Sequence, residues 1–300
     1  MSSIRRHNLE GIIAVLLSAT CFAVTAILLK KAFMLELSPL EILALQSWLA
    51  SLILLIYTVF FRREVFKVSL RFLIVISLQG IAGSLGTSVF YAYSLKLLPV
   101  SVATLLLYLY PVLVIGAGVL LFNKTVSRQE GLALFLTLLG TVTASGVFLG
   151  VENVSMMGIL FGIGAAASYA VFNLVGEIAL NEVSPLTTMC FSQWVSTVGL
   201  FIYFRGDITR IPWTSPGIWQ IGLALATIAS ILPFYLVLVG IQRIGADKAS
   251  ILSTFELPMT FFLAALFLNE TPTLLQIVGG GLVLGGIILL NRRKLYVKEP

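Results

Sequence analysis

Ten apolar segments, each of about 20 residues, follow one another along the chain with only short polar stretches between them. A helix of that length crosses the ~30 Å hydrocarbon core of a bilayer. The segments are continuously apolar and do not alternate, which favours helices over a β-barrel. We therefore predict an all-α integral membrane protein with ten transmembrane helices. The predicted spans are 11–31, 40–61, 72–95, 101–122, 130–148, 157–180, 185–204, 218–241, 247–268 and 273–290.

The composition excludes a soluble globular domain. Of the 300 residues, 59% are hydrophobic and 11% are charged, whereas soluble domains carry about 25% charged residues. The net charge of +6 comes from Lys and Arg in short runs between spans, so we interpret these residues as topology signals and predict no nucleic-acid partner. Cys21 and Cys190 lie inside spans and His7 precedes the first span, which predicts no disulfide, metal site or cofactor.

The basic residues also predict an orientation. If the N-terminus is cytoplasmic, most of the 19 Lys and Arg residues fall on the cytoplasmic side of the membrane. The positive-inside rule then places both termini in the cytoplasm. The first apolar run is too long for the hydrophobic region of a signal peptide, so we expect it to remain as the first span.

The second half of the chain repeats the first. Paired landmarks recur at a separation of between 144 and 147 residues, a distance that contains five spans. Because five is odd, the second repeat must enter the membrane from the opposite side, which predicts inverted repeats over residues 1–148 and 156–300 with a linker at 149–155. Secondary transporters are built in this way, with the substrate site near the midplane between the repeats. The paired landmarks are Ser38-Pro39 with Ser184-Pro185, Trp48 with Trp194, Pro111 with Pro258, and Asn123 with Asn269.

One carboxylate stands deep in an apolar span. Glu256 lies nine residues after Asp247, or about 13 Å along a helix, which is close to the bilayer midplane. An acid at that depth costs roughly 2.5–3.5 kcal/mol or more, so it implies a partner or a wet cavity. Aligned on the prolines, the first half carries Leu109 at the equivalent position. Pro111 and Pro258 each remove a helical hydrogen bond, and we predict that they act as hinges.

The two halves also resemble a known family. The strings FYAYSLKLLPVSVATLLLYLYPVLV and IGADKASILSTFELPMTFFLAALFLNETPTLLQIVGG, with the five-span repeat, resemble the EamA-type transporters of the drug/metabolite transporter superfamily. The resemblance implies a carrier of small organic metabolites, often an exporter of amino acids, in the inner or plasma membrane, with a central cavity lined by the first, third and fourth helices of each half. The chain departs from the family pattern at Lys124, where a Glu is common, and at Glu256, which is separated from Pro258 by Leu257.

The predicted substrate-binding residues combine the deep acid with polar and aromatic side chains on neighbouring spans. Each has a simpler interpretation, because tyrosines commonly fill cores and interfaces, hydroxyls bond to their own helix, and a buried carboxylate can bind a neighbouring helix. Tyr108 and Tyr110 point about 200° apart on a regular helix and cannot both face one chamber squarely. The candidates are Glu256, Tyr110, Tyr108, Ser253, Thr20, Tyr169, Asn173, Tyr91 and Tyr235.

These observations predict alternating access between the two repeats and leave several alternatives open. The chain has no phosphate-binding G-x-x-x-x-G-K-[ST] loop, so a solute, proton or ion gradient or exchange must drive transport. Within the superfamily the alternatives are a nucleotide-sugar exchanger and a multidrug or cation carrier; outside it they are a channel and an intramembrane enzyme. We expect a small-molecule solute and the lipid bilayer as partners. Gly281-x-x-x-Gly285 in the last span allows either a monomer or a homodimer.

Overall fold

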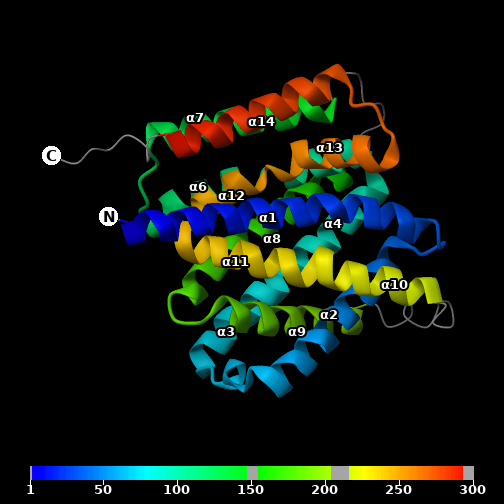
Figure 1. The fold of residues 1–300 in the computed structure, drawn as a ribbon, viewed down its shortest axis with the longest axis vertical. Helices are drawn as coiled ribbons and strands as arrows, with labels where there is room; N and C mark the ends of the chain where they lie inside the picture. Colours follow the sequence, from blue (N-terminus) through cyan, green and yellow to red (C-terminus); the bar gives the residue numbers. More distant parts are fainter. Residues whose placement is uncertain (1, 147–154, 204–215, 293–300) are drawn as a thin grey trace.

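The computed structural model describes residues 2–146, 155–203 and 216–292, and within these ranges the secondary structure is helical (Figure 1). The predicted linker falls outside the described residues except for Ser155. In the first half the elements are α1 (Ser2–Phe33), α2 (Pro39–Phe61), the 3₁₀ turn η1 (Arg63–Phe66), α3 (Leu70–Leu78), η2 (Gln79–Leu85), α4 (Gly86–Leu97), α5 (Val100–Leu107), α6 (Tyr110–Phe122) and α7 (Arg128–Ser145). In the second half they are α8 (Met156–Leu180), α9 (Pro185–Tyr203), α10 (Pro216–Ala224), η5 (Leu225–Ile231), α11 (Leu232–Ile244), α12 (Ala246–Ser253), α13 (Glu256–Leu268) and α14 (Leu274–Arg292).

Eight helical stretches in the described ranges, several of which include a short break or a π-helical segment, are long and apolar enough to cross a bilayer. They do not include α7 and α9, which correspond to the predicted fifth and seventh spans. Both are short, with 18 and 19 residues; α7 begins with charged residues, and Ser, Thr and Gln recur along α9. The eight spans are Arg6–Phe33, Pro39–Phe61, Leu70–Leu97, Val100–Phe122, Met156–Leu180, Gly217–Ile244, Ala246–Leu268 and Leu274–Asn291.

The repeat is visible in irregular features of the backbone as well as in the helices. The third and eighth spans each contain a seven-residue π-helical segment, η2 and η5, at equivalent positions. Helices α6 and α13 both have 13 residues, and each ends at an asparagine with positive φ, 52° at Asn123 and 54° at Asn269. π-helical segments are rare and occur often at functional sites. Their duplication shows that the two halves share one backbone plan.

The helices pack as equivalent pairs. Each pair joins one helix of each half: α1 lies along α11, and equivalently α8 lies along α4; α2 contacts α9, and α7 lies beside α14 along its length (Figure 1). Helices α7 and α14 approach closely because Gly140 and Gly279 have no side chain. A Cβ added at either position would lie within 2.5 Å of a backbone oxygen on the facing helix. The start of α1 and the end of α14 lie at the same side of the bundle (Figure 1).

Short sequence signals fix several helix starts. The Ser38 hydroxyl accepts a hydrogen bond from the Glu41 N–H while the Glu41 carboxylate accepts one from the Ser38 N–H, with Pro39 as the first residue of α2. The equivalent Ser184 hydroxyl accepts from the Thr187 N–H before α9. Side-chain acceptors of this kind satisfy donors that the first helical turn leaves free. The repeated pairs Ser38-Pro39 and Ser184-Pro185 therefore stand at the starts of α2 and α9.

Candidate functional site

Two discontinuous helices meet in the middle of the protein. Helix α5 ends at Leu107 and α6 begins at Tyr110, while α12 ends at Ser253 and α13 begins at Glu256. The helix bounds therefore make Tyr110 the counterpart of Glu256, one position away from the Leu109 that alignment on the prolines indicates. Helices α12 and α6 are packed together. At each break the carboxyl-terminal end of one half-helix, with a partial negative charge, faces the amino-terminal end of the next, with a partial positive charge.

Glu256 lies near four tyrosines from three different spans, and the Tyr108 hydroxyl is a hydrogen-bond donor to its carboxylate. Tyr91 comes from α4, Tyr108 and Tyr110 flank the break between α5 and α6, and Tyr169 comes from α8. We call these five residues the acid–tyrosine cluster. The break explains how both Tyr108 and Tyr110 reach the same acid: the backbone is not a regular α-helix between them, so the 200° angle expected from the sequence does not apply.

Contacts among the tyrosines hold the cluster in place. The Tyr110 hydroxyl donates to the Ser250 carbonyl at 3.1 Å, and its ring centre lies 4.5 Å from that of Tyr169 in an edge-on arrangement. The Tyr91 hydroxyl lies 2.7 Å from the Thr104 hydroxyl. Such ring pairs and hydrogen bonds are worth about 1 kcal/mol each. The cluster is thus a shaped and partly preorganised surface around one carboxylate.

The other predicted site residues divide into two groups. Ser253 lies beside Tyr110 and donates its hydroxyl to the Ala249 carbonyl. Thr20 and Asn173 likewise bond to carbonyls one turn back on their own helices, at 2.9 Å and 2.7 Å, so the simpler interpretation from the sequence accounts for their polar groups. Tyr235 is 37% exposed and lines a groove with α2 and α9, apart from the cluster. The prediction of Tyr235 as a substrate-binding residue receives no support from a contact with Glu256.

At one end of the bundle a lysine binds two acids. The Lys124 Nζ lies 2.7 Å from Glu177 Oε2 and 2.9 Å from Asp247 Oδ2, which joins the end of α6 to α8 and α12. The three side chains are 26–29% exposed. Burial lowers the pKa of Lys124, but the hydrogen bonds to Glu177 and Asp247 outweigh it, so its pKa lies above the ordinary value. Nearby, Arg243 of α11 pairs with Glu10 of α1. We call Lys124, Glu177 and Asp247 the inner ion cluster.

At the other end of the bundle the equivalent positions carry interchanged charges. Lys30, in the last turn of α1, lies 2.8 Å from Glu270, which follows α13. Glu270 stands 146 residues after Lys124, and Glu177 stands at the same position of its half as Lys30. This outer ion pair is 51% and 55% exposed. Sequence analysis did not place Lys30 in a site; comparison of Lys30 with Glu177 across the repeat was the signal that could have found the pair.

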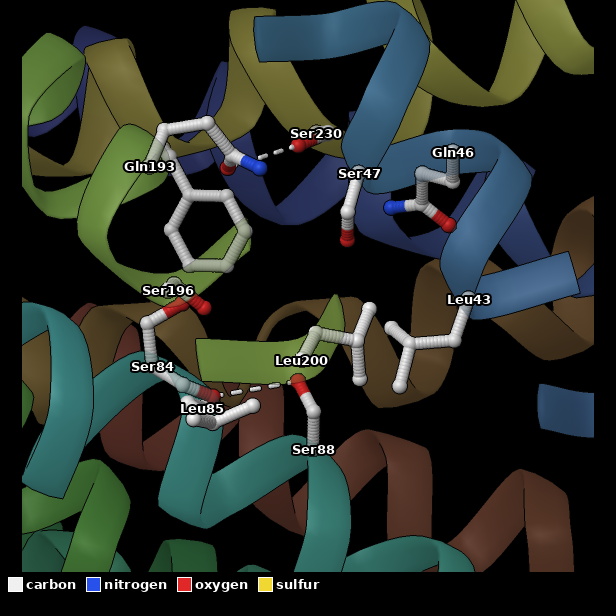
Figure 2. A pocket seen from close by; sticks show the side chains of 11 residues that line it. Leu43, Gln46, Ser47, Ser84, Leu85, Ser88, Gln193, Ser196, Leu200 and Ser230 are labelled. Carbon is white, nitrogen blue, oxygen red and sulfur yellow. Dashed lines mark hydrogen bonds between the residues drawn. The ribbon is translucent and has the colours of Figure 1, made fainter. Parts of the chain in front are cut away.

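A second polar feature lies between α2, α9 and the two π-helical segments. It is a cavity of about 30 Å³, lined by hydroxyl and amide groups and by apolar side chains but by no charged one (Figure 2). We call it the serine cavity. Ser84 of η2 and Ser230 of η5 are equivalent residues of the two halves, a repeat that sequence analysis missed. Its lining residues are Leu43, Gln46, Ser47, Ser84, Leu85, Ser88, Gln193, Ser196, Leu200, Ser230 and Phe234.

Curated relatives are described only as transporters. An uncharacterized transporter of Archaeoglobus fulgidus is 27% identical over 202 residues, covering 67% of this chain and 71% of the relative. An uncharacterized transporter of Synechocystis is 28% identical over 206 residues, covering 67% of this chain and 61% of the relative. A third, the uncharacterized transporter YcbK of Bacillus subtilis, is 26% identical over 203 residues and covers 65% and 64%.

A solved structure shares the fold. A protein crystal structure superposes with a TM-score of 0.79 at 20% identity, over 97% of this chain and 99% of the other. The model of the EamA-like transporter family matches twice, over residues 9–146 and 156–292. These matches cover both halves and confirm the family indicated by the sequence, which is one of transporters and not of enzymes. The chain belongs to the EamA-like transporter family and is a multi-pass membrane protein with two EamA domains.

Proposed function

We propose that the protein is a secondary-active transporter that moves small organic metabolites, amino acids among them, by alternating access and mainly outward. The observation that carries this proposal is the pair of equivalent ion contacts with interchanged charges, Lys124–Glu177 and Lys30–Glu270, at opposite ends of the helix bundle. Between them lies the acid–tyrosine cluster. A carrier needs a central site with one closable barrier on each side, and this arrangement supplies all three parts.

The proposed topology assigns each end of the helix bundle, with its ion contact, to one side of the membrane. With α7 and α9 counted as crossings, the protein has ten spans in two inverted five-helix repeats and both termini in the cytoplasm. The inner ion cluster then faces the cytoplasm and the outer ion pair faces the outside of an inner or plasma membrane. Residues 1–148 and 156–300 form the repeats. About 20 residues of α1 separate the Glu10–Arg243 contact from Lys30, or about 30 Å, the thickness of the hydrocarbon core.

The proposed cycle opens one ion contact at a time. In this structure both are formed, so neither end is released. Rupture of the inner ion cluster would free α6 from α8 and α12 and open the cytoplasmic side, whereas rupture of the outer ion pair would free α13 from α1. The breaks before Pro111 and Pro258 are natural bending points, because proline cannot complete the local hydrogen-bond pattern.

The chemistry of the cluster favours a solute with a cationic group. In the described part of the chain no Lys or Arg side chain pairs with Glu256, although it stands deep in a span. A buried carboxylate is stable only with a proton, a cation or hydrogen-bond donors. The surrounding tyrosine rings add apolar and cation–π surface. An amine-bearing metabolite fits this site better than a nucleotide sugar, which requires cations for its phosphates; a cation or multidrug carrier is the second candidate.

Flux measurements on one matched pair of variants test the proposal. Purified protein in proteoliposomes is assayed for efflux of a panel of labelled amino acids and amines. We expect wild-type flux of at least one amine-bearing solute, a loss of at least tenfold for Glu256→Gln, and little change for Glu36→Gln, an exposed acid in the loop after α1. If Glu256 instead couples protons, the Gln variant keeps exchange and loses only proton-driven transport. Wild-type gradient-driven flux in Glu256→Gln would contradict both roles.

A further inference from the structure

The serine cavity offers free hydrogen-bonding groups but no charge. Gln193 accepts from the Ser230 hydroxyl at 3.3 Å, and the Ser88 hydroxyl donates to the Ser84 carbonyl at 3.0 Å (Figure 2). No hydrogen bond is recorded for the hydroxyls of Ser47, Ser84 and Ser196 in the part of the chain that the structure describes. These groups can bind a small neutral polar group, while a charged group would be buried there without a counter-charge.

Two grooves approach the serine cavity from opposite ends of the bundle. The outer groove, of about 460 Å³, runs between η2, α4 and α9 and reaches Tyr203. The inner groove, of about 590 Å³, runs between α2, α9 and α11 and includes Tyr57. Tyr57 and Tyr203 are equivalent residues, 146 positions apart. The grooves are therefore related by the internal repeat, one in each half of the membrane's thickness.

The outer groove meets the cavity at a side chain of η2, and the equivalent side chain of η5 lines the inner groove. Leu85 lines the serine cavity and also the outer groove. Its counterpart Ile231 lines the inner groove and directly follows Ser230, which lines the cavity. A single apolar side chain, Leu85, thus separates the free hydroxyls from the outer groove.

The outer groove has a largely apolar lining that opens to the side of the bundle, whereas the inner groove also carries the exposed Arg62–Glu64 ion pair. Their rims carry large exposed apolar side chains, such as Ile202 at 64% and Ile81 at 53% in the outer groove and Leu232 at 45% in the inner groove. Exposed apolar residues on spanning helices face acyl chains, and tyrosines prefer the membrane–water interface. The compounds that reach the cavity by this route come from the bilayer.

We propose that the serine cavity and its grooves form a lipid-accessible binding site for an amphiphile with one long apolar chain and a small uncharged hydroxyl or amide end. The polar end enters between Ser84 and Ser230, and the chain lies in a groove and leaves sideways into the bilayer. The cavity has a volume of about 30 Å³, so the polar end must be small, such as a single hydroxyl or amide group. This site is separate from the acid–tyrosine cluster and does not depend on the transported solute.

Photolabelling with a long-chain alcohol tests the site. Protein in phosphatidylcholine vesicles is labelled with a diazirine-bearing analogue of hexadecanol, and the labelled peptides are mapped by mass spectrometry. We expect labels in residues 81–90 and 199–203 or in residues 231–235. Excess hexadecanol should compete about tenfold better than hexadecane, because the site supplies hydrogen bonds that the alkane cannot use. Palmitate should compete no better than the alkane.

Variants separate this site from ordinary lipid contact. Ser84→Ala with Ser230→Ala should remove the preference for hexadecanol over hexadecane, while Thr227→Val, a lipid-exposed change on η5, should keep it. Leu85→Trp should abolish labelling in the outer groove by filling its junction with the cavity. Equal competition by hexadecanol and hexadecane on the wild-type protein would overturn the proposal and leave the cavity with water only. A preference that survives the double serine change would overturn it as well.

Discussion

Lys124 and Glu270 occupy the same position in the two halves of the chain, each directly after a left-handed asparagine, and they carry opposite charges. Each binds a partner of the opposite sign at a second pair of equivalent positions, Glu177 and Lys30. Residues that only capped a helix end would have no reason to change sign together. The interchange keeps an attractive contact at each end of the bundle. If either lysine were exchanged for the residue at the equivalent position of the other half, two acids would face each other. The strength of each contact can therefore be changed independently of the other.

The inner ion cluster should contribute measurably to stability. Lys124→Ala leaves Glu177 and Asp247 facing each other while largely covered, which we expect to cost about 1–3 kcal/mol. Lys124→Glu should cost more, because it places three acids together. Adding Glu177→Lys to Lys124→Glu should recover most of the loss, since it restores attraction with the charges exchanged. The melting temperature of the purified protein in detergent, followed by tryptophan fluorescence, measures all three; a double variant no better than Lys124→Glu would show that the contact is incidental.

The outer ion pair should be weaker and sensitive to salt. Lys30 and Glu270 are more than half exposed, and such pairs are worth at most about 1 kcal/mol and are screened by salt. We expect Glu270→Gln to lower the melting temperature only slightly at low salt and not at all in high salt. Lys124→Ala should keep most of its effect under both conditions. Equal salt dependence of the two variants would contradict the difference in burial.

The Tyr169 hydroxyl should matter for transport, whereas the Tyr235 hydroxyl should not. Tyr169→Phe keeps the ring against Tyr110 but removes a hydroxyl from the acid–tyrosine cluster, and we expect transport efficiency (kcat/KM) to fall about fivefold to tenfold, as for loss of one hydrogen bond. Tyr235→Phe is the matched control, because Tyr235 lies in a groove outside the cluster. Initial rates of solute flux in proteoliposomes compare them, and equal losses for both would remove Tyr169 from the site.

Gln46 should stabilise the kinked eighth span. Pro233 has no N–H, so the Ala229 carbonyl one turn earlier lacks its usual helical donor; the Gln46 side chain of α2 donates to that carbonyl at 3.3 Å. Gln46→Leu leaves the carbonyl unpaired inside the protein, at a cost of about 1–3 kcal/mol. We expect a clear fall in melting temperature for Gln46→Leu and almost none for Thr227→Val. A melting temperature unchanged in Gln46→Leu would mean that water takes its place.

The sequence predicts the helical class, the repeat and the deep acid because each depends on local pattern or on a fixed separation along the chain. It does not predict that Tyr108 and Tyr110 both reach Glu256, since that depends on a backbone break whose extent a proline alone does not set. The serine cavity is equally hidden: Ser84 and Ser230 look like ordinary small residues in a span until packing places them around one space. The glycine motif of the last span shows the same limit of prediction from sequence. Gly279 packs against α7, whereas a Cβ added at Gly281 would meet no atom within 4 Å in the described structure.

Accessibility of the centre from each side of the membrane tests the gating account most directly. A single cysteine at Ser253, in a background with Cys21 and Cys190 replaced by Ala, is labelled with an impermeant maleimide from either side in oriented vesicles. We predict that Lys124→Ala raises labelling from the cytoplasmic side and lowers it from the outside, and that Glu270→Gln does the reverse. Changes in the same direction for both variants, or labelling unchanged by either, would contradict the account.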